Sequence, residues 1–465
     1  MKKLEKKKLI KIIFIIIILI LFGIYKIYEK YKYDHAVIKI KYIDYVNDKK
    51  QPYVKVKVYG KYKLKNLIKS INGKIITKNF DINTNKLGYQ TLNYKYINDD
   101  GITLPQTVKI KVVDEEKPVL YSYNRKTVYK GEVKDLKKEL FCGDNYDDKP
   151  KCEINDNYNL NEVGTYNITY KGEDNSGNVS TQDITLVVKE RSKTQNTNTS
   201  NKLTGTDYSE YVNSYKMENT KLGIDVSYWQ GDIDYEKVKK AGVDFVMIRV
   251  GYQKGINGEY VLDKKFKENI EGFNKVRIPV GIYFFSYADS KEEAKKEAKW
   301  VVKQIKDYKV EYPVAFDWEN WNMYNEFNLS FYHLTEIANT FMDYVKSKGY
   351  TPLNYSSKNY LENIWMDTKY DTWLAHYTAN TDYKGTYKMW QISDKGLIDG
   401  IDTNNVDIDL YIGIASLMWC YFLTYELYIS SSIFFSNSFI DFFIKSVPFL
   451  FVFIYSGLET SLYLL

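Results

Sequence analysis

Two carboxylates at positions i and i+2, Asp317 and Glu319, follow an apolar run and are the clearest sign of chemistry in the chain. In a β-strand such residues point to the same side, with Cα atoms roughly 6.5 Å apart. Two acids facing one pocket are typical of glycoside hydrolysis, where one protonates the leaving oxygen and the other supports the cationic transition state. The spacing alone allows a retaining or an inverting course, because side-chain rotamers decide the distance between the carboxyl groups.

More acids end other apolar runs. Asp225 closes the run that begins at Leu222, while Asp407 and Asp409 lie in the run near residue 410. Any one of these acids alone is better explained as a cap on a loop or helix. Because they lie on the first, fourth and eighth runs, they become neighbours only if the runs close into a barrel. Active sites of such barrels lie at the C-terminal ends of the strands, so the pattern favours an acidic active site.

From Leu222 onward, strand-like apolar runs alternate with amphipathic helical stretches, which predicts an α/β fold. The predicted strands lie near residues 222–227, 243–252, 278–288, 312–319, 350–357, 371–378, 387–393 and 406–411. Helices fit after the first five strands, whereas the later gaps are too short for crossover helices. Residues 220–413 are therefore predicted to form an irregular (β/α)8 barrel, with five βα units and then mostly strands.

Short motifs occur in a fixed order through this stretch: residues 223–230 (GIDVSYWQ), 279–283 (PVGIY), 317–319 (DWE), 373–375 (WLA), 390–391 (WQ) and 406–409 (VDID). Together they resemble glycoside hydrolase family 25, the lysozymes that cleave the β-1,4 bond after N-acetylmuramic acid. The resemblance covers about residues 220–413. It also implies the same barrel, with five βα units followed by strands with few helices.

By this resemblance Glu319 would act as general acid and then base, and Asp317 would orient the 2-acetamido group of the substrate. Asp225 and Asp407 would complete an acidic floor. The resemblance implies retention with help from the acetamido oxygen, without a protein nucleophile. The side chains expected to bind the glycan are Tyr283, Tyr355, Trp373, Trp390 and Gln391.

The sequence departs from the usual family pattern at two places. Asp409 stands where asparagine is common, and Phe284 or Phe285 stands where a histidine often follows the tyrosine. These departures concern fine specificity more than catalysis.

The N-terminus has the composition of a membrane anchor. Residues 1–8 are rich in lysine, and an almost unbroken apolar run follows from Leu9 to Tyr25. This predicts a cytoplasmic segment at 1–8, one transmembrane helix at 9–28 and an extracellular remainder. A cleaved signal peptide is the alternative, although residues 23–26 (GIYK) offer no small-x-small cleavage site.

An internal repeat with an offset of about 76 residues precedes the barrel: Gly88, Tyr94 and Gly101 correspond to Gly164, Tyr170 and Gly177. Alternating strands with Asn/Asp/Gly turns predict two small β-sandwich modules, at 34–114 and 115–190. The second resembles the immunoglobulin-like modules of bacterial surface proteins. A spacer role is expected for both, with ligand binding as the alternative. Residues 191–219 are predicted to be a flexible linker.

The chain has three cysteines, two of which, Cys142 and Cys152, flank a short polar loop. They form either one extracellular disulfide or two free thiols. No metal site is expected, because two cysteines without a nearby histidine supply too few ligands. No cofactor is expected, and the sequence gives no oligomeric state.

The last 52 residues, 414–465, are nearly uncharged and rich in Phe, Leu and Ser. They are either a membrane-associated segment or a tail translated out of frame, the latter being favoured. The net charge of +7 is spread over the chain without the basic stripe that nucleic-acid binding requires.

The leading hypothesis is a peptidoglycan hydrolase, an N-acetylmuramidase, that remodels the cell wall of a Gram-positive-type bacterium. Its partners would be peptidoglycan glycan strands and, through the N-terminal helix, the cell membrane, with the catalytic domain outside. The alternatives are a non-catalytic peptidoglycan-binding surface protein and a defective product with an altered tail.

Overall fold

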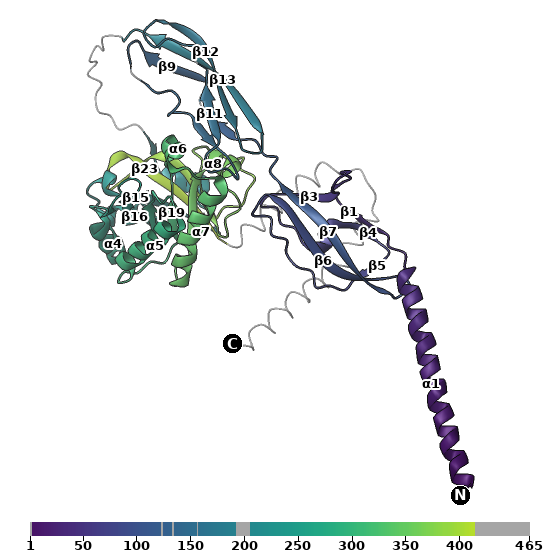
Figure 1. Ribbon diagram of the computed structural model, residues 1–465. Helices are drawn as coiled ribbons and strands as arrows, with labels where there is room; N and C mark the ends of the chain where they lie inside the picture. The colour runs from purple at the N-terminus through teal and green to yellow at the C-terminus, as the bar shows by residue number, and fades with distance from the viewer. Residues whose placement is uncertain (1, 122–123, 133, 156, 192–204, 414–465) are drawn as a thin grey trace, which may run out of the picture. The chain divides into compact units, whose positions relative to one another are not determined.

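The computed structural model describes residues 2–121, 124–132, 134–155, 157–191 and 205–413 (Figure 1). These residues form two compact units. The first covers the chain up to residue 191 together with 320–335 and 364–366, and the second covers the other described residues. The predicted tail at 414–465 lies outside the described residues, as does residue range 192–204 of the predicted linker.

The first unit begins with the helix α1 (Lys2–Asp34). At 1.5 Å per residue its 33 residues extend about 50 Å. From Lys11 onward α1 is long and apolar enough to cross a membrane, and none of this stretch is buried by the described protein. Apolar side chains exposed on all sides are suited to a lipid environment. The span predicted at 9–28 falls within this helix.

The first β module contains a five-stranded sheet and a two-stranded sheet. The larger sheet has the order β2 (Tyr45–Val46), β3 (Tyr53–Lys57), β7 (Thr103–Val113), β6 (Gly88–Asn98) and β5 (Gly73–Ile75). The smaller sheet pairs β1 (Ile40–Tyr42) with β4 (Ile68–Ile71). Alternate residues of β6 and β7 are buried, so Tyr96 and Ile110 pack with Val56 in the core.

The second module has the same plan. A four-stranded sheet has the order β11 (Lys151–Ile154), β12 (Gly164–Glu173), β13 (Val179–Lys189) and β9 (Arg125–Tyr129). The small sheet pairs β8 (Val119–Tyr121) with β10 (Phe141–Gly143). Of the two alternatives for the cysteines, the structure takes the disulfide, which joins Cys142 on β10 to Cys152 on β11 across the two sheets.

The predicted repeat is visible strand by strand. β12 begins 76 residues after β6 (164 − 88), and β13 begins 76 residues after β7 (179 − 103). In each hairpin the turn contains a glycine with positive φ, +79° at Gly101 and +88° at Gly177. Side chains other than glycine rarely adopt this conformation, so the spacing of these glycines fixes the register of both hairpins.

Within the first unit, the second module also contacts residues 320–335, which include η3 (Trp321–Met323) and α6 (Tyr324–Phe327). The Asn325 side chain donates to the Leu140 carbonyl at 2.6 Å. The backbone N–H of Phe331 donates to the Asp144 carbonyl at 2.8 Å. The loop after β10 therefore holds a segment that directly follows Glu319 in the chain.

The second unit contains a closed barrel of eight strands, and all eight lie where the sequence predicts them. Five helices follow the first five strands, and Figure 1 shows α4, α5 and α7 around the outside of the barrel. The strands in sheet order are β15 (Thr220–Val226), β16 (Phe245–Gln253), β18 (Val280–Phe285), β19 (Val314–Asp317), β20 (Pro352–Ser357), β21 (Thr372–Ala375), β22 (Met389–Ile398) and β23 (Ile401–Ile412). The helices are α3 (Tyr235–Lys240), α4 (Phe266–Lys275), α5 (Lys291–Ile305), α7 (Phe331–Ser347) and α8 (Lys358–Asn363).

The last strand makes this barrel depart from a regular (β/α)8 fold. β23 is antiparallel to both of its neighbours, β22 and β15. Only Asp399 and Gly400 connect β22 to β23, with φ of +97° at Gly400. Because two residues suffice only for an antiparallel hairpin, the short last gap in the sequence reflects this reversal, whereas β21 and β22 remain parallel.

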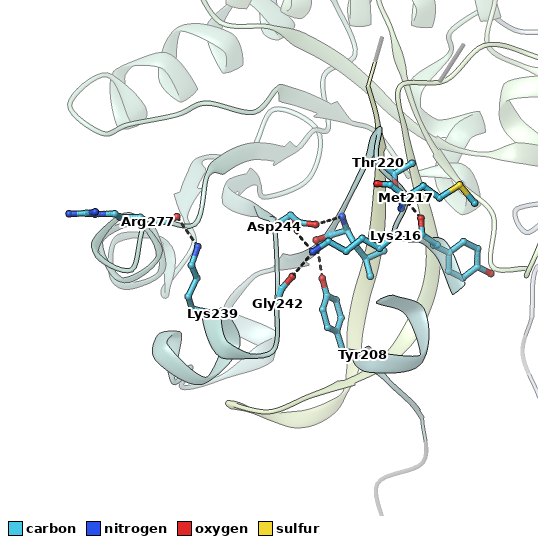
Figure 2. Close-up of polar contacts among 10 residues, drawn as sticks. Tyr208, Lys216, Met217, Thr220, Lys239, Gly242, Asp244 and Arg277 are labelled. Atoms are coloured by element: carbon cyan, nitrogen blue, oxygen red, sulfur yellow. Dashed lines mark hydrogen bonds and ion pairs between the residues drawn. The ribbon is translucent and has the colours of Figure 1, made fainter. Parts of the chain in front are cut away.

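The prediction of a flexible linker at 191–219 is wrong from residue 206 onward. β14 (Thr206–Asp207) pairs with β22, and α2 (Tyr208–Tyr215) follows, capped by the Asp207 side chain. Figure 2 shows how this segment is fixed: Tyr208 donates to the Leu222 carbonyl at 2.9 Å, and Lys216 forms a 3.0 Å ion pair with Asp244. Buried tyrosines supply the apolar contacts here, which a scan for aliphatic periodicity overlooks.

The barrel interior is filled by side chains rather than hollow. Phe245, Met247, Leu353 and Met389 are fully buried there, and the Phe245 ring stacks on Tyr312 with centroids 4.5 Å apart. A packed interior leaves the C-terminal ends of the strands as the place for a site.

We expect Phe245→Ala to lower the free energy of unfolding of the barrel by about 3–5 kcal/mol, because it leaves a cavity in a packed interior. Phe245→Leu should cost clearly less. Denaturant unfolding followed by tryptophan fluorescence measures this, since all eight tryptophans lie at or after Trp229. A loss below about 1 kcal/mol for the alanine variant would contradict a filled interior.

Candidate active site

The structure brings the predicted acids together inside one end of the barrel. Asp225 lies on β15 and is directly opposite Asp407 on the neighbouring strand β23. Asp317 is the last residue of β19, and Glu319 follows two residues later. Asp225 and Asp317 are 6% and 3% exposed, whereas Glu319 is exposed to solvent. The site is therefore a buried acidic floor with one accessible carboxyl group.

Strand alternation directs Asp317 into the barrel, and Glu319, just beyond the end of β19, contacts the Asp317 side chain. Ala315 packs in the barrel interior, and Asp317 follows on the same side. Phe316 points outward against Phe341 of α7, with ring centroids 5.2 Å apart. Trp318 is fully buried and its indole N–H donates to the Ala288 carbonyl at 3.3 Å. The outward aromatic side chains thus anchor the strand end that presents the two acids.

Gln391 on β22 orients Asp225. Its amide nitrogen donates to Oδ2 of Asp225 at 2.8 Å. Its amide oxygen accepts from the hydroxyl groups of Tyr355 at 2.8 Å and Tyr377 at 3.0 Å. The two hydroxyl donors leave the amide nitrogen directed at Asp225, so the network favours the ionised form of this carboxyl.

Asp225 also faces Asp409. Burial raises the pKa of Asp225 to about 6 and raises that of Asp409 well above its usual range. The indole N–H of Trp373 donates to Oδ1 of Asp409 at 2.8 Å. Two buried carboxylates at such close range cannot both ionise, so Asp409 holds the proton and donates it toward Asp225.

Asp317 and Glu319 form a second coupled pair. Burial raises the pKa of both carboxyl groups, and repulsion from Glu319 raises that of Asp317 further. Oδ1 of Asp317 is buried and has no hydrogen-bond partner among the described residues. The two carboxyl groups therefore titrate as a coupled pair that binds its first proton more tightly than an isolated acid does. A carboxyl pair whose pKa is raised in this way is suited to general acid catalysis.

Asp407 is held neutral by the same crowding. Burial raises its pKa to about 9, and repulsion from Asp225 and Asp394 adds to the effect. At pH 7 Asp407 therefore presents a protonated carboxyl beside the ionisable Asp225.

Two contributors were not identified from the sequence. Arg249 on β16 pairs with the buried Asp263, with its Nη2 at 2.8 Å from Oδ2, and its charge lowers the pKa of Asp317. The sequence offered one signal for Arg249, a charged residue within the otherwise apolar run 245–250. Tyr377, whose hydroxyl contacts Gln391, lies after β21 and had no distinguishing pattern.

The residues predicted to bind the glycan divide into two groups. Tyr283, Tyr355 and Trp373 line the interior next to the acids, with the Tyr355 and Trp373 rings 4.8 Å apart. The structure does not bring Trp390 to them: it points to the other face of β22, where its indole N–H donates to the His376 carbonyl at 2.8 Å.

The exposed aromatic side chains near the site are Trp229 and Tyr377, at 69% and 52% exposure. Trp229 follows β15 within the motif GIDVSYWQ. Exposed rings at the strand ends are better placed to contact a sugar than buried Trp390.

Part of the chain is similar to known proteins. Residues 224–401 match the family Glycosyl hydrolases family 25. The uncharacterized protein YegX of Escherichia coli K12 is 27% identical over 196 residues, which cover 41% of this chain and 69% of that protein. The autolytic lysozyme of Clostridium acetobutylicum is 25% identical over 190 residues, covering 40% and 54%.

Solved structures were compared as well. The modular autolysin LytC of Streptococcus pneumoniae, in complex with a synthetic peptidoglycan ligand, aligns with 24% identity and a TM-score of 0.37, covering 52% of this chain and 56% of that chain. A family 25 glycosyl hydrolase from Bacillus anthracis aligns with 20% identity and a TM-score of 0.36, covering 43% and 93%. The chain thus spans about half the length of LytC.

The raised pKa of Asp407 predicts how the stability of the barrel depends on pH. Its pKa is about 9 in the folded chain against a usual 3.8, so the folded state binds this proton more tightly than the unfolded state. The corresponding stability is complete below about pH 4 and is lost as the pH rises toward about 9. We expect Asp407→Asn, which stays neutral, to raise the unfolding temperature of the barrel by a few °C at pH 8 and not at pH 4.

Thermal unfolding followed by tryptophan fluorescence at the two pH values measures this difference. Asp402→Asn, an exposed position on the same strand, is the matched control. Equal effects of Asp407→Asn at pH 4 and pH 8 would refute the raised pKa.

Proposed function

Because residues 224–401 form a glycosyl hydrolase family 25 domain, we propose that this chain is a peptidoglycan hydrolase that cleaves the β-1,4 bond between N-acetylmuramic acid and N-acetylglucosamine. The carrying observation is the Asp317–Glu319 pair, two coupled carboxyl groups with raised pKa values beside the buried acids of the barrel. This equipment suits protonation of a glycosidic oxygen and stabilisation of positive charge at the anomeric carbon.

Glu319 is the proton donor in this proposal, because it is the exposed member of the pair. Its proton moves to the glycosidic oxygen as the bond from that oxygen to the anomeric carbon breaks. The oxygen of the substrate's own acetamido group then bonds to the anomeric carbon from the opposite face. The Glu319 carboxylate next removes a proton from water, which attacks the same carbon and releases the acetamido oxygen, so that the configuration is retained.

Asp317 orients the acetamido group. It is buried and contacts Glu319, and its Oδ1, which has no partner among the described residues, is available to accept the acetamido N–H. A carboxyl group in this place also favours positive charge as it develops on the acetamido group. Asp225, oriented by Gln391, adds negative potential to the pocket, while the Asp407 carboxyl group stays neutral beside it.

Glycan binding in the proposal rests on aromatic side chains of two kinds. Tyr283, Tyr355 and Trp373 form the inner wall beside the acids. Trp229 and Tyr377 offer exposed rings for sugar faces at the rim. The alternative of a non-catalytic glycan-binding protein is disfavoured, because a decayed site usually loses one member of the catalytic pair and this chain has both.

The helix α1 is proposed as a single-pass anchor with residues 1–8 in the cytoplasm, and the two β modules as an immunoglobulin-like stalk. A hydrolase tied to the outer face of a membrane acts on nearby wall. The proposed role is therefore local remodelling of the cell wall and not release of a diffusing lytic enzyme.

We expect Glu319→Gln to lower the release of reducing ends from purified peptidoglycan by at least about 100-fold, because glutamine cannot transfer a proton. The assay uses the full chain in detergent, and turbidity loss is recorded in parallel. Glu311→Gln makes the same change at an exposed position shortly before β19 and should retain activity.

No release by the unmutated chain, together with retained binding to peptidoglycan, would establish the non-catalytic alternative. Equal release by the unmutated chain and Glu319→Gln would refute the role assigned to Glu319.

The anchor is tested separately by fractionation of cells that express the full chain. We expect the protein to stay with membranes after alkaline carbonate extraction and to keep its N-terminal residues on mass analysis. A protein that begins after residue 23 and appears in the soluble fraction would show a cleaved signal peptide instead.

A further inference from the structure

A second acidic cluster lies in the first unit and contains none of the residues assigned to hydrolysis. Asp114, Asp144 and Asp174 each bring one carboxylate oxygen to within 4.8 Å of the others. The three side chains are 7%, 0% and 5% exposed. Asp114 directly follows β7 of the first module, whereas Asp144 and Asp174 directly follow β10 and β12 of the second. Three buried acids thus meet where the two modules join.

Each acid uses oxygen atoms to organise its own loop. Oδ1 of Asp144 accepts the backbone N–H groups of Tyr146 and Asp147, at 2.9 and 2.8 Å. Oδ1 of Asp114 accepts the N–H of Glu116 at 3.2 Å. Asp174 accepts the N–H of Asn178 at 2.7 Å. These contacts hold the carboxyl groups rigidly in place.

These contacts do not account for the second carboxylate oxygen of Asp114 and of Asp144. Oδ2 of Asp114 and Oδ2 of Asp144 are buried and have no hydrogen-bond partner among the described residues. The same is true of Oδ1 of Asn145, whose amide nitrogen donates to Asp114 at 3.2 Å. Buried acceptors without donors cost free energy unless a ligand satisfies them. A cation satisfies several such oxygens at once.

The internal repeat shows that the turn itself does not require a charge. In the first module Asn98 occupies the position of Asp174 (174 − 98 = 76), and its Oδ1 accepts the Ile102 N–H at 2.9 Å. Asp174 makes the same contact with Asn178. Because a neutral asparagine organises the equivalent turn, the geometry of the turn does not explain why residue 174 carries a negative charge.

We propose that Asp114, Asp144 and Asp174, with the amide oxygen of Asn145, form a calcium site at the junction of the two β modules. All the donors are oxygens, the ligand type that Ca²⁺ prefers, and none is the sulfur or imidazole nitrogen preferred by zinc. Oxygens bound to one Ca²⁺ at about 2.3–2.6 Å lie at most about 5 Å apart, which matches the cluster. The expectation of no metal site considered cysteine ligands and missed acids from three separate segments.

A bound cation would connect the end of β7 to two loops of the second module. It would also offset the desolvation that raises the pKa of the Asp144 carboxyl to about 6. The loop containing Asp144 is the one that contacts residues 320–335, through the Asp144 carbonyl and through the Asp148 carboxylate, which accepts the Ser330 N–H at 2.8 Å. Calcium therefore orders both the module junction and this loop.

The test is calorimetric titration of the full chain, in detergent and freed of metal with EGTA, with CaCl2. We expect one Ca²⁺ per chain with a dissociation constant of about 10⁻⁴ M or lower. Asp144→Asn and Asp174→Asn should each weaken binding at least tenfold. Asp183→Asn, an exposed aspartate of the same module, should bind as the unmutated chain does.

Thermal unfolding separates lost binding from misfolding. Ca²⁺ should raise the unfolding temperature of the unmutated chain and of Asp183→Asn, and should leave Asp174→Asn unchanged. In EGTA, Asp174→Asn should unfold at the same temperature as the unmutated chain or higher, because it removes a buried charge and copies the residue of the first module.

Three results would overturn the proposal. They are no binding heat and no thermal shift at millimolar Ca²⁺, equal affinity in the unmutated chain and the two cluster variants, and a shift with Mg²⁺ as large as that with Ca²⁺. The readouts do not involve hydrolysis, so the outcome is independent of the proposed enzymatic function.

Discussion

The barrel depends on how it accommodates several carboxyl groups in one desolvated interior. Asp225, Asp317, Asp407 and Asp409 all face the same enclosed space, where like charges at close range cannot all persist. The protein responds by keeping protons on some of them and giving donors to others. Gln391 donates to Asp225 and Trp373 donates to Asp409. The positive charge of Arg249, which pairs with Asp263, lowers the pKa of Asp317. The protonation pattern that results is also what the proposed chemistry requires.

The closing hairpin makes this crowding possible. If β23 ran parallel to β22, a long crossover would have to connect the two strands. The direction of β23 beside β15 would then be reversed. The reversal at Asp399 and Gly400 instead places Asp407 opposite Asp225, and Asp409 opposite Gly223. The absence of a side chain at Gly223 matters, since a Cβ there would lie 2.6 Å from the Phe245 ring. Closure, packing and the acidic floor thus depend on the same few strand positions.

The two acidic clusters of the chain illustrate different solutions to the burial of negative charge. In the barrel, buried acids face one another, and their mutual repulsion and desolvation raise the pKa of their carboxyl groups. At the module junction, Asp114 and Asp144 each keep one oxygen without a donor among the described residues. Rigid loops hold those oxygens in place through backbone N–H groups. The first arrangement suits proton transfer, and the second suits a cation that is held in place.

The sequence alone determined the eight strands, the five helices, the 76-residue repeat and the acids at strand ends, because alternation and local spacing record which face of an element is buried. It also predicted that Asp317 and Glu319 lie together, since only one residue separates them in the chain, although β19 ends at Asp317. Tertiary structure decided what depends on distant segments: the reversal of β23, the outward direction of Trp390, the ordered helix α2 in the predicted linker, and the choice of the disulfide. The meeting of Asp114, Asp144 and Asp174 belongs to the same class, because 60 residues separate the first from the last (174 − 114). Proximity between such segments arises from packing, and no local pattern in the chain encodes it.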